Sequence, residues 1–171
     1  MKVLKFLMAI LIGSTLLFSS CKKTDNNEQE SINVIKLKLG SATYTWSDTD
    51  GAGGKAPVID SIKLAVNATS AFTVELSDGS VSPAKDYTAE VIAEKNDHLF
   101  VYTVTGAKLA ASALSTDANG KTFGQSGTMT ATTASTGTLQ IVLKHLPDKS
   151  AANPAITGET DVDVVFPVVI K

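Results

Sequence analysis

The only two histidines of the chain, His98 and His145, stand in separate segments where apolar and polar residues alternate. Such alternation predicts strands, and imidazole nitrogens on neighbouring strands can bind zinc or copper, with a carboxylate as a further ligand. If the two strands pair, Asp161 or Asp163 can complete the set. The pattern therefore predicts a transition-metal site, for metal binding or for a metal-dependent enzyme. The alternative is that each histidine packs or forms hydrogen bonds within the fold.

A glycine-rich acidic segment, residues 48–54 (DTDGAGG), is a second candidate site. Asp48 and Asp50 precede a glycine as at the start of a calcium loop, and calcium takes about 6 to 8 oxygen ligands. Ile59 stands where a helix-loop-helix calcium loop needs glutamate, which excludes that form. Two hypotheses remain: calcium held with oxygens from another loop, such as residues 117–120, or a tight turn of the kind that aspartate and glycine form without an ion.

Trp46 comes directly before this acidic segment, and Tyr44 lies on the same strand face two residues earlier. Aromatic rings beside a loop can serve as platforms for sugars, which together with the acidic segment predicts a calcium-dependent glycan-binding or adhesion module. The competing interpretation is that both rings pack into the core.

No complete catalytic constellation stands in the sequence. The chain lacks a Gly-x-Ser-x-Gly elbow and a phosphate-binding loop, and its single cysteine, Cys21, has another expected role. The sequence therefore favours a non-enzymatic binding or structural function, with an envelope protein or a small ligand as the partner.

The N-terminal residues predict export and lipidation. A short lysine-bearing start precedes an apolar run at 6–18, which is shorter than the roughly 20 apolar residues needed to span a bilayer. Residues 17–21 (LFSSC) resemble a bacterial lipobox, in which a diacylglycerol is attached to Cys21, although Phe18 replaces the usual leucine. We expect residues 1–20 to be a lipoprotein signal peptide and 21–31 a polar tether. A soluble secreted protein is the alternative.

The charge balance narrows the location and the partners. Lys22 rather than aspartate follows the cysteine, which favours the outer membrane, with the domain facing the periplasm or the surface. Loss of residues 1–20 leaves 13 lysines against 17 acids, a side-chain charge of -4. Because every cation is a lysine and the chain is acidic, nucleic acid is excluded as a partner.

Beyond residue 31 the sequence predicts an all-β domain, residues 32–171, of ordinary composition with 43% hydrophobic and 19% charged residues in the whole chain. Two-residue periodicity predicts eight or nine short strands, which favours an antiparallel immunoglobulin-like or jelly-roll sandwich over a closed barrel. A bulge is expected at residues 34 and 35, where two apolar residues adjoin. The predicted strands cover residues 32–39, 42–46, 58–66, 71–76, 98–105, 109–115, 127–133, 138–146 and 160–170.

One short helix is predicted within residues 82–96, with Asp86 near its start. We expect Tyr87, Val91 and Ile92 to cover one end of the sandwich. The run is short enough that a strand is the alternative interpretation.

Four segments resemble a family of outer-membrane lipoproteins from Bacteroidetes-type bacteria: residues 45–57, 96–102, 143–147 and 158–164. The resemblance covers nearly the whole chain after Cys21, but Ala52 stands where the family often has an acid. It implies an outer-membrane lipoprotein without implying an activity. Members often carry the label of a type 1 periplasmic-binding fold, which the length and periodicity of this chain exclude because that fold consists of two large α/β lobes.

Overall fold

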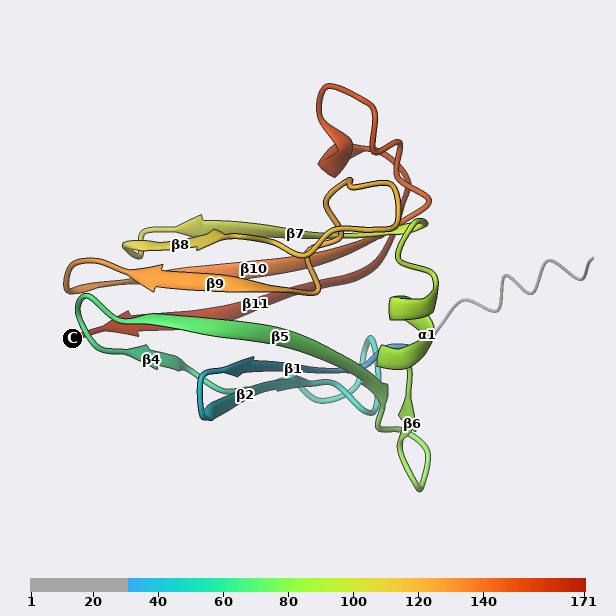
Figure 1. The fold of residues 1–171 in the computed structure, drawn as a ribbon. Helices are drawn as coiled ribbons and strands as arrows, with labels where there is room; N and C mark the ends of the chain where they lie inside the picture. Colours follow the sequence, from blue (N-terminus) through green and yellow to red (C-terminus); the bar gives the residue numbers. More distant parts are fainter. Residues whose placement is uncertain (1–30) are drawn as a thin grey trace, which may run out of the picture.

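The computed structural model describes residues 31–171, which form two packed β-sheets (Figure 1). The predicted signal peptide, Cys21 and all but the last residue of the predicted tether lie outside the described residues. The expected all-β sandwich is confirmed, and there is no barrel closure between the two sheets in the described part.

The larger sheet has the strand order β3-β2-β1-β5-β9-β8, and β6 pairs with β5 beside this path. The smaller sheet has the order β4-β11-β10-β7. Every pairing is antiparallel except that of β4 with β11. The strands are β1 (Val34–Leu39), β2 (Ala42–Ser47), β3 (Val58–Ile59), β4 (Ile62–Leu64), β5 (Thr69–Asp78), β6 (Lys85–Asp86), β7 (His98–Thr105), β8 (Leu109–Ser112), β9 (Ser126–Ala131), β10 (Ser135–His145) and β11 (Glu159–Ile170).

The structure has eleven strands and not the expected eight or nine, because residues 58–66 form two short strands, β3 and β4, and because the two-residue β6 was not predicted. The predicted single strand over 58–66 is instead β3 in one sheet and β4 in the other. Asp60 lies at the break, where its backbone amide donates to the Thr45 carbonyl and its carboxylate accepts from the Thr45 amide (2.9 and 2.8 Å). These bonds end the β3 pairing, and the chain then crosses to the other sheet.

The prediction of a bulge at residues 34 and 35 is wrong. β1 stays in continuous register with β2 and β5 from Val34 to Leu39. Ile32 precedes the paired region, so the alternation of buried and exposed residues begins at Val34 and needs no correction.

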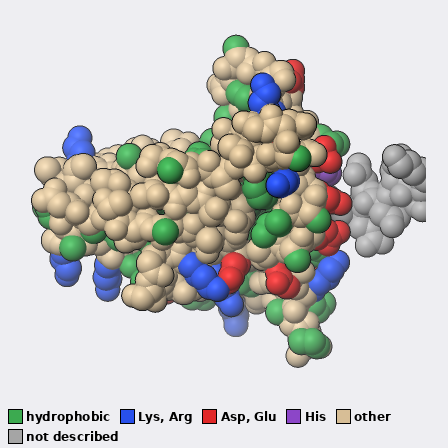
Figure 2. All heavy atoms as spheres, in the orientation of Figure 1, with side chains coloured by type: hydrophobic (Ala, Val, Ile, Leu, Met, Phe, Trp, Pro, Cys, Tyr) green, Lys and Arg blue, Asp and Glu red, His purple; other side chains and the backbone are tan. Residues whose placement is uncertain are grey.

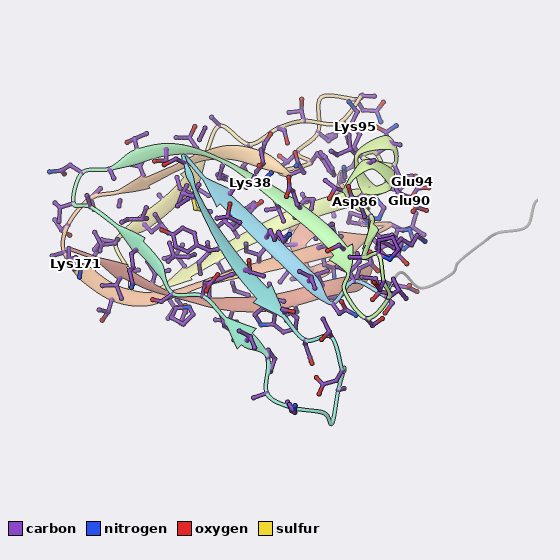
Figure 3. The ribbon with its side chains drawn as sticks, turned by 90° about the horizontal axis from the view of Figure 1, so that it is seen from below. Lys38, Asp86, Glu90, Glu94, Lys95 and Lys171 are labelled. Atoms are coloured by element: carbon purple, nitrogen blue, oxygen red, sulfur yellow. The ribbon has the colours of Figure 1, made fainter. Side chains whose placement is uncertain are left out.

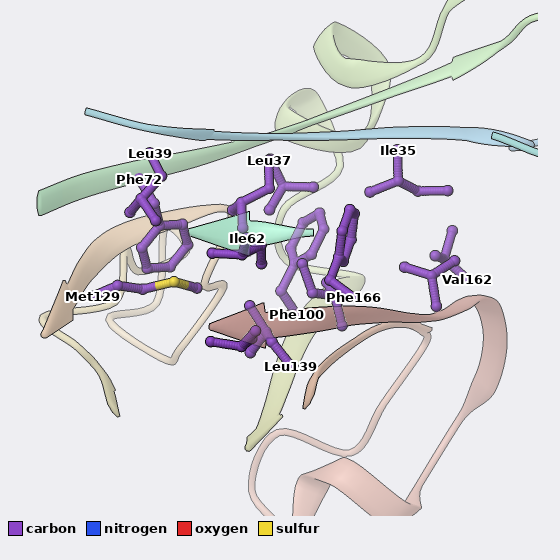
Figure 4. Packing of buried hydrophobic residues seen from close by; sticks show 14 of the residues in the cluster. Ile35, Leu37, Leu39, Ile62, Phe72, Phe100, Met129, Leu139, Val162 and Phe166 are labelled. Carbon is purple, nitrogen blue, oxygen red and sulfur yellow. The ribbon is translucent and has the colours of Figure 1, made fainter. Parts of the chain in front are cut away.

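Residues facing inward from both sheets form one core. Figure 4 shows Ile35 and Leu37 of β1 opposite Val162 and Phe166 of β11, with Phe100 of β7 between the sheets. This inner layer is apolar along most of its length, so a polar side chain on an inward position stands out as an exception.

The predicted helix is present but short, α1 at Thr88–Ala93. The Asp86 carboxylate accepts from the Thr88 amide (2.7 Å), and hydrogen bonding from the side chain and the amide of Thr88 lowers the pKa of Asp86. Tyr87 and Val91 are buried as expected, whereas Ile92 is 42% exposed because it points away from the sheets. A 3-10 turn covers Pro154–Ile156. No helix in the described range is long and apolar enough to cross a membrane.

The two ends of the sandwich differ in their connections. At one end, which we call the turn end, the strands are joined by short turns such as residues 40–41, 106–108 and 132–134. At the other, the loop end, lie α1 and the long connections at residues 48–57, 79–84 and 146–158. Figure 1 shows α1 and the protruding loops at the end where the described chain begins, and the C terminus at the opposite end.

The core alternation predicts unequal effects of two neighbouring substitutions. Phe166→Ala removes a ring that is 0% exposed and should lower the free energy of unfolding by about 3 to 5 kcal/mol. Val165→Ala, on the outer face and 42% exposed, should cost less than about 1 kcal/mol. Urea denaturation measures both, and equal losses would contradict the assigned faces of β11.

Candidate histidine and carboxylate site

Strand register brings the two histidines together. β7 and β10 are antiparallel neighbours, and His98 and His145 are direct partners in the last pair at the loop end. Both histidines lie on inward positions of their strands, His98 two residues before the buried Phe100 and His145 two residues after the buried Leu143. Their rings are stacked, with centroids 4.9 Å apart and planes 10° from parallel. Pairing of the two strands, the condition that the sequence left open, is therefore met.

A β-bulge brings Asp161 to the same place. Leu143 pairs with Val162, but the next residue, Lys144, pairs with Thr160, so Asp161 is an extra residue on β11. Strict alternation from the inward Val162 would put Asp161 on the outer face, whereas a bulge redirects a side chain. Its Oδ2 lies 3.7 Å from Nε2 of His98.

Asp163, the other carboxylate considered for this site, lies elsewhere. It pairs with Val142 on the outer face, and its Oδ1 accepts a hydrogen bond from Nε2 of Gln140 (2.6 Å). Glu159, by contrast, is the strand partner of His145 and so joins the acidic surroundings of the histidine pair.

Helix α1 and the turn after it fix the orientation of the His98 ring. His98 is 2% exposed, and its Nδ1 lies 3.1 Å from the carbonyl oxygen of Glu94. A carbonyl can only accept, so Nδ1 carries the hydrogen. In neutral His98 the lone pair is therefore on Nε2, the atom that faces Asp161.

Burial shifts both groups toward their neutral forms. Burial lowers the pKa of His98, and nearby His145 acts in the same direction, against the Glu94 carbonyl and the Asp161 charge. Burial raises the pKa of Asp161, and Glu159 adds to this, while the two histidines and Lys144 oppose it. The site therefore disfavours a fixed His98-Asp161 ion pair.

This arrangement places nitrogen and oxygen ligand atoms side by side without completing a metal centre. Within residues 31–171, no three histidine, cysteine or carboxylate side chains are grouped so as to hold a metal ion as they stand. The parallel ring stack accounts for this, because stacked rings do not direct their nitrogens to one point.

The acidic segment at residues 48–54 is organised by its own backbone. Asp50 accepts a hydrogen bond from the Lys55 amide (3.0 Å), and a side chain on Gly54 would collide with the Asp50 carboxylate. The amide of Asp48 donates to Asn33, while its Oδ1 is buried without a hydrogen-bond partner. The Asp50 hydrogen bond and the close approach of Gly54 are those of a tight turn.

Trp46 and Tyr44 lie on inward positions of β2, opposite Ile35 and Leu37 of β1. Both rings are partly buried and pack against the core. The Tyr44 hydroxyl also donates to the Lys63 carbonyl (2.9 Å). These contacts favour the packing interpretation over a glycan platform.

A buried ion pair holds two loops together, and sequence reasoning missed it. Nζ of Lys149 lies 3.0 Å from Oδ2 of Asp117, and the side chains are 8% and 1% exposed. Lys149 also donates to the carbonyl of Lys95, after α1 (2.6 Å). Burial alone would raise the pKa of Asp117, but Lys149 and the amides of Lys121 and Asn119 hold it below its ordinary value. Asp117 is therefore engaged in the fold.

Nothing in the local sequence reveals this pair, because its members are 32 residues apart on different loops. The segment 117–120 was considered as a source of calcium ligands for residues 48–54. One Asp117 oxygen instead accepts from two backbone amides, and the other contacts Lys149.

The loop end is acidic. Figure 3 places Asp86, Glu90 and Glu94 together around α1, with Lys95 beside them, and Lys171 at the opposite end of the molecule. Figure 2 shows acidic side chains gathered at the loop end beside a histidine. Clustered negative charge raises the local concentration of cations, so this end favours a cationic ligand.

An open, largely apolar groove of about 460 Å³ lies apart from the histidines, between β7 and β8. Its one polar ring, Tyr102, donates its hydroxyl hydrogen to the Gly124 carbonyl (2.7 Å), and burial raises its pKa. The groove residues are Phe100, Val101, Tyr102, Val104, Ala110, Ala111 and Leu114.

Comparisons with protein-family models, with curated proteins and with solved structures gave no match to this chain.

The buried ion pair predicts a large loss of stability on truncation of one partner. Lys149→Met leaves the buried Asp117 charge without its counter-ion and with hydrogen bonds to one oxygen only, which should cost about 3 to 5 kcal/mol of unfolding free energy. Lys38→Met is the matched control, because its pair with Glu75 is 49% and 37% exposed and should contribute less than about 1 kcal/mol. Chemical denaturation compares them. Similar values for both variants would refute a structural role for the buried pair.

Proposed function

We propose that this protein is a lipid-anchored lipoprotein of the cell envelope with a non-enzymatic binding role. The observation that carries the proposal is that the folded domain begins well after Cys21. Every element of the described sandwich begins after residue 33, so cleavage before Cys21 would remove none of them. The lipobox-like segment LFSSC and the polar stretch after it supply the anchor and the tether.

The tether sets how the domain stands relative to the membrane. Eleven residues, 21–31, span at most about 40 Å when extended, and the described chain enters the sandwich at the loop end (Figure 1). With Cys21 acylated, the loop end is the nearer end to the membrane surface. We propose the outer membrane as the location because Lys22 replaces the aspartate that favours inner-membrane retention.

The binding role is assigned to the loop end. Long connections on a rigid sheet scaffold are where binding residues usually concentrate, and here they gather at one end together with the histidine pair. No complete catalytic set accompanies them in the described residues, which is why we propose binding or structural work and not catalysis. An envelope protein or a small ligand would be the partner.

Lipidation is tested by metabolic labelling with a palmitate analogue in a Gram-negative host. The wild-type chain should incorporate label and partition into membranes, whereas Cys21→Ser should lose the label and retain residues 1–20. Phe18→Leu restores the usual lipobox leucine and should be processed at least as fast as wild type. Ser19→Ala serves as the neutral control. Continued labelling of Cys21→Ser, or an unlabelled wild-type chain that stays in the soluble fraction, would overturn the proposal.

A further inference from the structure

We propose that His98, His145 and Asp161 bind one divalent transition-metal ion, such as Zn²⁺, at the loop end of the sandwich. This assignment names a ligand class for the proposed binding role, and it rests on that role but not on the lipid anchor. It is carried by four features of the site: two facing acceptor atoms, two paired imidazoles, a fixed His98 tautomer and an acidic setting.

The first feature is the gap between His98 and Asp161. The hydrogen of neutral His98 is on Nδ1, so Nε2 and the carboxylate Oδ2 are both acceptors, and they face each other at 3.7 Å. That is too long for a hydrogen bond. Two ligands of a tetrahedral zinc ion at bond lengths of about 2.0 to 2.2 Å stand about 3.4 Å apart. A metal ion between these atoms would bond to both after a small movement.

The second feature is the pairing of His98 with His145. Direct partners on antiparallel strands have Cβ atoms about 4.5 to 5.5 Å apart, which lets both side chains reach one ion. The parallel stack must first open, and His145 is the ring that can turn because it is only partly buried, whereas His98 is 2% exposed. Rotation of His145 toward Asp161 would give three protein ligands.

The third feature is the support of the ligands. A metal-bound histidine commonly donates its other ring hydrogen to a backbone carbonyl, which fixes the tautomer and orients the ring. The Glu94 carbonyl does this for His98. The β-bulge orients Asp161, because without the extra residue its carboxylate would lie on the outer face of the sheet.

The fourth feature is charge. Glu159 and Glu94 lie close enough to affect the two titrating groups of the site, and the surrounding surface is acidic. Lys144, the neighbour of His145, donates to the Thr160 hydroxyl on the outer face (2.8 Å) and forms no hydrogen bond with Asp161. A divalent ion would therefore meet three carboxylates, those of Asp161, Glu159 and Glu94, against the ammonium of Lys144.

Metal titration of the full chain, purified in detergent and stripped with a chelator, tests the site. Zn²⁺ is followed by calorimetry, and Co²⁺ by the visible absorption bands of a low-coordinate ion with nitrogen ligands. We expect one ion per chain and a rise in melting temperature on Zn²⁺ binding. Ca²⁺, which prefers sites made of oxygen ligands alone, should bind far more weakly.

The variants isolate the ligands. Asp161→Asn and His145→Gln should each weaken Zn²⁺ binding by at least about tenfold. Asp163→Asn, the same change two residues along β11 on the outer face, should leave it unchanged. His98→Asn retains an amide able to donate to Glu94 but lacks Nε2, and it should lose the Co²⁺ bands while melting cooperatively.

Substoichiometric Zn²⁺ binding, or equal binding by Asp161→Asn and Asp163→Asn, would overturn the metal site. The Cys21→Ser chain should bind Zn²⁺ as wild type does. If the wild-type chain takes up no palmitate label but binds Zn²⁺, only the lipid-anchor proposal fails. If it takes up the label but binds no Zn²⁺, the lipid-anchor proposal stands and the metal site is refuted.

Discussion

The candidate site depends on one constraint, the residue-by-residue register between β7 and β10. Antiparallel ladders place direct partners on the same face, and a slip of one residue would turn every side chain of one strand to the other face. The register is held by the apolar inward positions next to the histidines on each strand, among them Phe100 and Leu143, which must stay in the core. The energy that fixes the histidine pair is therefore the burial of residues that take no part in binding.

In the same sheet, the β-bulge between β10 and β11 supplies the carboxylate of Asp161. Between β10 and β11 the regular alternation serves the core from Val162 to Ile170, and it ends at the bulge, where Asp161 is inserted. The bulge lies at the last point before the loop end, where an inward polar side chain no longer displaces a core residue. Core packing and a polar site thus occupy adjacent stretches of one strand.

The two ends of the sandwich differ in their connections and in the role we propose for them. Short turns join the strands at the turn end, while the loop end carries α1, the long connections and a group of acidic side chains (Figure 2). The Lys149-Asp117 pair fastens two of these loops and the end of α1 beside the histidines. Such a pair is costly to desolvate, and its value here lies in holding loops that have little hydrophobic contact of their own.

The sequence by itself determined the all-β class, the position of the short helix and most strand positions, including β7 at 98–105, because two-residue alternation is a local pattern written in consecutive residues. It also named His98 and His145 as a pair, with Asp161 or Asp163 as the third ligand, but on the condition that their strands pair. Only the tertiary structure decided that condition, the choice of Asp161 over Asp163, the division of residues 58–66 between two sheets and the Lys149-Asp117 pair. Each of these depends on which distant segments become neighbours and in which register, and that is settled by the packing of the whole core and not by any local run of residues.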